Sequence, residues 1–197
     1  MTLEIVQTGH PVLRTVARQL TLEEILSDST KQLIEQMRDT MREAPGVGLA
    51  APQIGESLQL AVIEDRSEYI KDASPEQLAK QKRSTVDFHV IINPRLHLVG
   101  DDTVDFYEGC LSVTGYGAVV GRSAKVRVEC LNEFAEPITI NAEGWYARIL
   151  QHEIDHLNGT LYIDRMQTRS FTTMENVDRF WRGRSIEEIK QQLRLDS

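Results

Sequence analysis

The sequence has little cysteine, no excess of basic residues and no long apolar run. Only Cys110 and Cys130 occur among 197 residues, so a disulfide framework is excluded and a reducing compartment is the default. The net charge of −8 argues against a nucleic-acid-binding protein. No segment approaches the roughly 18 apolar residues of a membrane span, and the first residues lack signal- or transit-peptide character. A cytoplasmic protein is predicted, although a mature organellar form would look the same.

The hydrophobic content of 41% suits one globular domain with a sizeable core. A helix is predicted over 28–44, where apolar residues recur at helical spacing. The stretch 66–87 is polar and predicts a surface insertion, with a helix beginning near Ser74. Strands are predicted at 58–63, 88–92, 96–99, 126–131, 137–140 and 161–163.

The stretch 151–159 contains the pattern His-Glu-x-x-His. Residues four apart share one face of a helix, so His152 and His156 can direct two imidazoles at one metal ion. Glu153 can then reach a metal-bound water as a base, and Gly159 can end the helix. A surface helix with two coincident histidines would show the same five residues, so other stretches must distinguish the two interpretations.

A third ligand is needed for a catalytic metal site. The downstream histidine of one metalloprotease pattern is excluded, because Tyr162 stands in its place. Glu175 downstream and Cys110 upstream remain candidates, and Cys110 is the better one because its surroundings resemble a loop. Cys130 lies in an alternating strand and is predicted to be a buried apolar residue. A non-catalytic, metal-stabilised binding module would require four protein ligands, and no fourth is apparent.

The stretch 46–55 is rich in glycine and alanine. Small residues let another backbone approach closely, and Gln53 is its only side chain with both a donor and an acceptor. On its own, the stretch is better explained as an ordinary turn before a strand.

Three stretches resemble, in order and separation, the motifs of the peptide deformylase family: 46–53, 108–112 and 151–156. The resemblance covers roughly residues 5–170 and looks closer to the mitochondrial-type branch. It implies a single-domain α+β fold in which antiparallel strands surround a central metal-binding helix. Residues 1–170 would form the catalytic domain and 171–197 a C-terminal extension with a short helix. The implied activity is metal-dependent removal of the N-formyl group from N-terminal formyl-methionine of new polypeptides, with a zinc peptidase as the alternative.

The resemblance also implies the role of each site residue. The metal ligands would be Cys110, His152 and His156, and Glu153 would be the general base and then the acid. The oxyanion would be stabilised by Gln53 and the backbone N–H of Leu111. The backbone near Val47, Gly48 and Gly109 would hold the peptide as an added strand. The implied metal is Fe²⁺, for which Zn²⁺, Ni²⁺ or Co²⁺ can substitute.

Two positions depart from the pattern of many bacterial members. Trp145 and Arg148 stand where aliphatic residues would line the methionine pocket, and an arginine there is expected to snorkel or form an ion pair. Arg122 and Asp155 match a structural ion pair of the family.

The C-terminal segment offers two interpretations. The apolar stripe of Ile186, Ile189 and Leu193 is predicted to pack on the body of the protein or on a second subunit. The alternative is weak association with the ribosome, for which the net charge of the segment is unfavourable. The expected partners are N-formylmethionyl peptides, with no sequence-specific nucleic-acid binding and no membrane.

Overall fold

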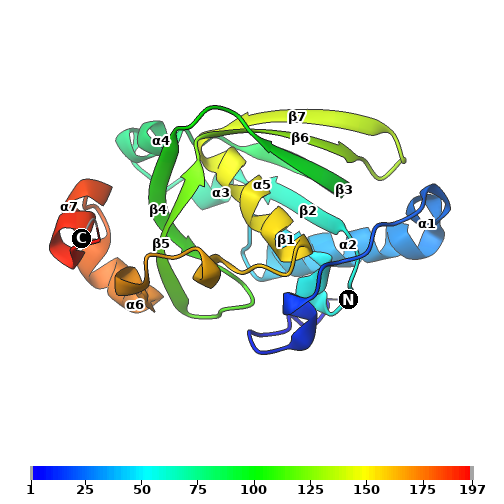
Figure 1. Ribbon diagram of the computed structural model, residues 1–197, viewed down its shortest axis with the longest axis horizontal. Helices are drawn as coiled ribbons and strands as arrows, with labels where there is room; N and C mark the ends of the chain where they lie inside the picture. The colour runs from blue at the N-terminus through cyan, green and yellow to red at the C-terminus, as the bar shows by residue number, and fades with distance from the viewer. Residues whose placement is uncertain (1, 196–197) are drawn as a thin grey trace.

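A computed structural model describes residues 2–195, and in it two antiparallel sheets pack with several helices, an α+β architecture (Figure 1). The larger sheet has the order β1-β2-β3-β6-β7. Its strands are β1 (Gly48–Ala50), β2 (Leu60–Asp65), β3 (Val86–Leu98), β6 (Lys125–Leu131) and β7 (Pro137–Glu143). The smaller sheet has the order β4-β5-β8. Its strands are β4 (Thr103–Gly109), β5 (Tyr116–Ser123) and β8 (Thr172–Thr173).

Helix α5 (Gly144–Leu157) contacts five strands of the larger sheet and β5 of the smaller one, and it crosses the middle of the view in Figure 1. Most of its residues are buried, and Ala147, Leu150 and Ile154 join the core of the larger sheet. The helix ends where the sequence predicts, because Gly159 adopts a left-handed φ of 69°. This helix carries the His-Glu-x-x-His pattern.

The other helices surround this framework. They are α1 (Leu22–Leu26), α2 (Asp28–Glu43), α3 (Ser67–Ile70), α4 (Pro75–Gln81), α6 (Met174–Asn176) and α7 (Ile186–Leu193). Short 3₁₀ turns cover Pro11–Arg14, Ala51–Ile54, Tyr162–Asp164 and Thr168–Ser170, and a π-helical turn covers Val177–Trp181. Helix α2 confirms the predicted helix, and its apolar stripe is buried. Helix α4 begins at a capping box made by Ser74 and Gln77, as expected from the sequence.

Two strand predictions are wrong. The strands predicted at 88–92 and 96–99 are parts of one strand, β3, which continues through a register shift between Ile92 and Arg95. Asn93 takes a positive φ of 51° there, and its side-chain amide bonds both backbone groups of Leu20, at 3.0 and 2.8 Å. The predicted strand at 161–163 is instead a 3₁₀ turn, because the Asp164 carboxylate accepts the amide of Leu161 at 2.8 Å and tightens the chain.

The C-terminal helix packs on the body of the protein, as the apolar stripe predicts. Ile189 is only 4% exposed. Lys190 reaches Asp105 of β4 at 2.8 Å, and Arg169 donates to the carbonyl of Leu193 at 2.8 Å. In Figure 1 the smaller sheet lies between this C-terminal segment on one side and α5 on the other. Within residues 2–195, no helix is both long and apolar enough to cross a membrane.

Candidate active site

Cys110, His152 and His156 form a cluster where the end of β4 meets α5. The potential ligand atoms of the three residues all lie within 4.8 Å of one another. Cys110 Sγ is 3.2 Å from His156 Nε2, and the two imidazole rings are 5.0 Å apart between centroids. Among residues 2–195 no other group of three such side chains meets the same condition.

The other two candidates for a ligand lie elsewhere. Cys130 is buried in the core of the larger sheet, where burial raises the pKa of its thiol to about 11. Glu175 is an exposed residue of α6 and takes no part in the cluster. The ligand set of a peptidase that uses Glu175 is therefore not assembled in this structure.

Glu108, the penultimate residue of β4, orients the first histidine. Its carboxylate accepts a hydrogen bond from His152 Nδ1 at 3.0 Å, which leaves Nε2 of that ring to face the cluster. Arg122 donates two more bonds to it, both at 2.9 Å. Burial opposes ionisation of Glu108, but the bonds from Arg122 and His152 hold its pKa well below the usual range. The carboxylate therefore stays charged and fixes the ring.

Arg148 is buried and forms an ion pair rather than snorkelling to solvent. It donates to Glu108 at 2.6 Å and to the carbonyl of Val120 at 2.9 Å. Its guanidinium also lies over the ring of Phe106, 5.3 Å from the centroid, and 6.0 Å from that of Trp145. The arginine that departs from the aliphatic pattern thus neutralises Glu108 and supports the aromatic wall of the pocket.

A second set of ion pairs ties α5 to β5. Arg122 of β5 bonds Asp155 of α5 as well as Glu108, so the expected pair between Arg122 and Asp155 is present. Arg165 adds two bonds to the same carboxylate, at 2.6 and 2.7 Å. Asp155 lies between His152 and His156 on α5, so these bonds brace the helix that positions both rings.

Glu153 is buried beside the cluster. It is 3% exposed, and its Oε2 has no hydrogen-bond partner within the described part of the chain. Burial raises the pKa of this carboxyl to about 7. The carboxyl packs against Gly48, since a Cβ at that position would lie 2.2 Å from Glu153 Oε1. The glycine of the small-residue stretch therefore makes room for a carboxyl that can hold or release a proton near neutral pH.

Gln53 directs its amide nitrogen toward the cluster. Its Oε1 accepts the backbone N–H of Ala50 at 2.9 Å, which fixes the side chain. Its Nε2 then lies 3.6 Å from Cys110 Sγ and 3.4 Å from Ser112 Oγ. An N–H donor is thus held at the site by a carboxamide that is 1% exposed.

These residues line a pocket of about 650 Å³, a size typical of ligand sites. Eight of the nine site residues named from the sequence are in its wall: Val47, Gly48, Gln53, Gly109, Cys110, Leu111, His152 and Glu153. The ninth, His156, lies behind them in the cluster. The wall also contains Trp145 and Arg148, at the two positions that the sequence analysis assigned to the methionine pocket. Tyr107, Tyr116, Ile149 and Met174 line it as well, and the sequence did not indicate them as site residues. Strands β1 and β4, each at the edge of its sheet, flank this pocket.

The donor set suits a transition-metal cation. Thiolate and imidazole are ligands that such ions prefer, and three protein ligands leave one position open. Burial works against a charge on His152, but Cys110 and Glu108 raise its pKa well above the usual value. The pKa of His156 is lowered by burial and by His152. Cys110 and Glu108 therefore favour a positive charge at His152, whereas His156 stays neutral, the form in which an imidazole can bind a metal ion.

The fold and this site define a candidate metal-dependent hydrolase, with a Cys-His-His cluster, a buried carboxyl and an amide donor around one pocket. The family model for polypeptide deformylase matches residues 2–171, and the chain belongs to this family.

The comparisons with individual proteins agree. The chain is 50% identical over 175 residues to peptide deformylase 1A, chloroplastic, of Solanum lycopersicum. The match covers 89% of this chain and 63% of the plant protein. It is 36% identical over 170 residues to the mitochondrial peptide deformylase of Homo sapiens, and the match covers 86% of this chain and 70% of the human protein. Among solved structures, the chain is similar to the Met-Ala-Ser-bound crystal structure of a class I type b peptide deformylase from Acinetobacter baumannii, with a TM-score of 0.75 and 31% sequence identity. The match covers 84% of this chain and 99% of the Acinetobacter chain. The chain thus spans less than two thirds of the length of the tomato relative.

Proposed function

We propose that this protein removes the formyl group from the N-terminal formyl-methionine of newly synthesised polypeptides. The observation that supports this most is the buried Glu153 carboxyl beside the Cys110–His152–His156 cluster, in a pocket between two strand edges. The similar Acinetobacter protein has Met-Ala-Ser bound, a peptide that begins with the methionine such a reaction would leave.

Cys110, His152 and His156 would hold one divalent metal ion. Zinc would bind this donor set well by intrinsic affinity. We nevertheless propose Fe²⁺ as the metal in the cell, on the strength of the family likeness, with Zn²⁺, Ni²⁺ or Co²⁺ able to substitute. When bound, such a cation lowers the pKa of water at its open position to about 7.

Glu153 performs the proton transfers. Its carboxylate accepts a proton from the attacking water while the new C–O bond forms at the formyl carbon. It then delivers a proton to the departing nitrogen as the C–N bond breaks, giving formate and a free α-amine. A pKa of about 7 lets the same group take both parts at neutral pH.

Two donors would stabilise the negative charge that develops on the formyl oxygen. Gln53 Nε2 already points into the site, and the backbone N–H of Leu111 adjoins Cys110. Loss of one such donor typically costs about 2.7–4 kcal/mol of transition-state stabilisation.

The peptide would bind as an additional strand along the free edges of β1 and β4, with backbone contacts near Val47, Gly48 and Gly109. The close packing of Glu153 on Gly48 leaves the reacting end of the pocket narrow. A formyl carbon carries only hydrogen beyond the amide, so a narrow site admits it and excludes the larger acetyl group.

A reducing compartment, the cytoplasm by default, fits this function, because a Cys110 thiolate has to stay reduced to serve as a ligand. Association with the ribosome is a weaker part of the proposal. Helix α7 packs through Ile189, so a ribosomal contact would have to use its exposed face.

The test is deformylation of formyl-Met-Ala-Ser by protein purified without oxygen, with acetyl-Met-Ala-Ser as the control. We expect formate release from the first peptide alone, with one equivalent of metal per chain. No release from the formyl peptide by metal-loaded protein would overturn the proposal.

A further inference from the structure

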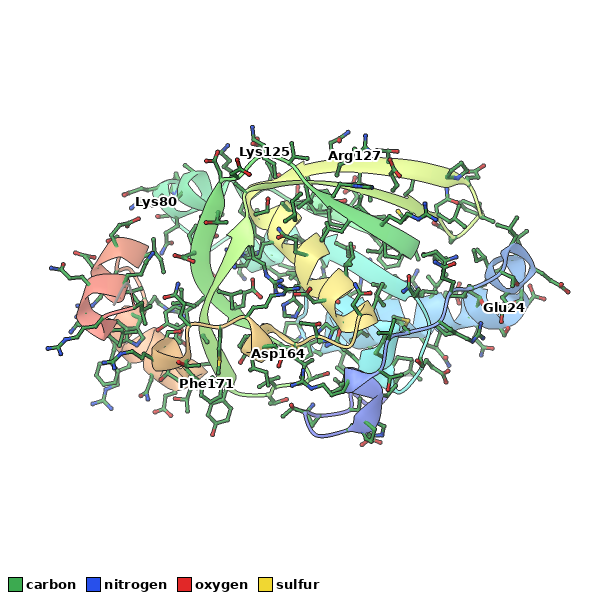
Figure 2. The ribbon with its side chains drawn as sticks, in the orientation of Figure 1. Glu24, Lys80, Lys125, Arg127, Asp164 and Phe171 are labelled. Carbon is green, nitrogen blue, oxygen red and sulfur yellow. The ribbon has the colours of Figure 1, made fainter. Side chains whose placement is uncertain are left out.

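Met174 lies beyond residues 2–171, which the family model matches, yet it lines the pocket. It follows β8 directly, and the pairing of β8 with β5 fixes its backbone. Its amide donates to the carbonyl of Gly115 at 2.9 Å. Met174 is 39% exposed, so an anchored, polarisable side chain stands partly uncovered at the pocket, where it can adapt to varied partners. Phe171, labelled in Figure 2, precedes this segment and stacks on Tyr116, which also lines the pocket.

Two glycines locate the sulfur of Met174. Gly109 of β4 and Gly117 of β5 lie opposite each other in the sheet. A Cβ on Gly117 would lie 2.8 Å from Met174 Sδ, and one on Gly109 would lie 3.9 Å from it. The sulfur therefore covers the sheet face toward which these two residues would direct their side chains.

That face is turned away from α5. Side chains alternate along a strand, and Glu108 points toward α5, where it bonds Arg148 and His152. The side-chain position of Gly109 therefore lies on the opposite face of β4. The side chain of Tyr107, two residues earlier, is on that same face and also lines the pocket.

The side chains of a peptide bound along the edge of β4 would alternate between the two faces in the same way. This step rests on the proposed function. If its methionine side chain enters the part of the pocket lined by Trp145 and Ile149 of α5, the next side chain points to the other face. Directly opposed side chains of neighbouring strands have Cβ atoms about 4.5–5.5 Å apart and interact. We propose that Met174 contacts the side chain of the second substrate residue and gives the enzyme a preference for an apolar residue there.

The first experiment compares kcat/KM for formyl-Met-Leu-Ser and formyl-Met-Ser-Ser. In the unmodified protein the leucine peptide should be preferred, and Met174→Ala should reduce this preference by about two- to five-fold, the range of one cross-strand apolar pair. Phe180→Ala is the matched control, because Phe180 is 48% exposed in the same C-terminal segment and is not among the described residues that line the pocket. It should leave the preference unchanged.

A second variant separates contact from a general loss of structure. Met174→Glu should raise the ratio of kcat/KM for formyl-Met-Lys-Ser over formyl-Met-Asp-Ser, since a carboxylate at this position attracts one side chain and repels the other. A merely destabilised site would reduce both rates equally. Unchanged ratios in both variants, with normal deformylation by the unmodified protein, overturn this inference alone. No deformylation of any formyl peptide by the unmodified protein overturns the proposed function as well.

Discussion

Glu153 is the residue on which the proposed chemistry most depends, and its replacement gives the first prediction. Glu153→Gln preserves the shape of the side chain against Gly48 but removes the group that accepts a proton. General acid–base catalysis contributes about 10²–10⁴-fold, so turnover should fall within that range while the metal stays bound. Metal analysis and steady-state kinetics on the same preparation check both parts. Near-normal turnover would mean that another group moves the proton.

The two cysteines give a matched pair for the second prediction. Cys110→Ala should lose the metal and the activity, because one of three clustered ligand atoms is removed. Cys130→Ala should keep both, since Cys130 packs in the core of the larger sheet. Metal content per chain is the measurement, and equal content in the two variants would reject the assignment of Cys110.

At the residue scale, the sequence indicated the candidate metal ligands and the ion pair between Arg122 and Asp155, but it missed other contacts that support the site. His152 and His156 were predicted as one face of a helix, and that helix is present. Glu108 was missed as the partner of His152, because a contact across 44 positions has no local pattern. Met174 gave no signal, since its place in the pocket depends on the pairing of β8 with β5.

At the scale of secondary-structure elements, α7 gives the third prediction. Ile189→Ala removes a side chain that is 4% exposed from the helix that Lys190 links to Asp105 of β4. We expect a loss of about 2 kcal/mol in the free energy of unfolding, the lower end for a buried isoleucine, because α7 lies at the periphery. Gln191→Ala, at an exposed position of the same helix, is the control. Urea denaturation of both variants checks this, and equal stability would mean that α7 does not hold to the body in solution.

The strands divide into those that the sequence predicted and those that it did not. Strands β2, β6 and β7 were predicted in outline from their β-branched or alternating residues, and they belong to the larger sheet. Strands β4 and β5 were missed. Strand β4 contains Asp105 and Glu108, and β5 contains two glycines, so neither shows a regular apolar alternation. Their pairing satisfies the backbone, and buried ion pairs satisfy their charged side chains.

At the scale of the whole molecule, the candidate metal site joins parts of the chain that are far apart in sequence. Cys110 follows β4 of the smaller sheet, whereas both histidines belong to α5. A cation bound there would link the end of β4 to α5 and would stabilise only the folded state.

Metal removal is therefore the fourth prediction. Saturation at about 100 times the dissociation constant contributes about 2.7 kcal/mol, which for a chain of this length corresponds to a decrease in Tm of roughly 5–10 °C on chelation. Thermal unfolding with a chelator, and again after metal is restored, measures this change. Cys110→Ala should show no metal-dependent shift, and an unchanged Tm in the unmodified protein would mean that no ion is held.

The open edges of β1 and β4 also bear on how the protein behaves at high concentration. Unpaired strand edges are templates for pairing with other chains, and folded proteins usually blunt or cover them. Here neither strand has a second partner within residues 2–195, and both border the pocket. The residues of β1 are buried, whereas most of those in β4 are at least partly exposed. A bound peptide would cover the edge of β4, and an empty pocket would leave that edge open to neighbouring copies. Concentrated protein without peptide should therefore aggregate sooner, and a product peptide such as Met-Ala-Ser should act as a solubilising agent in storage.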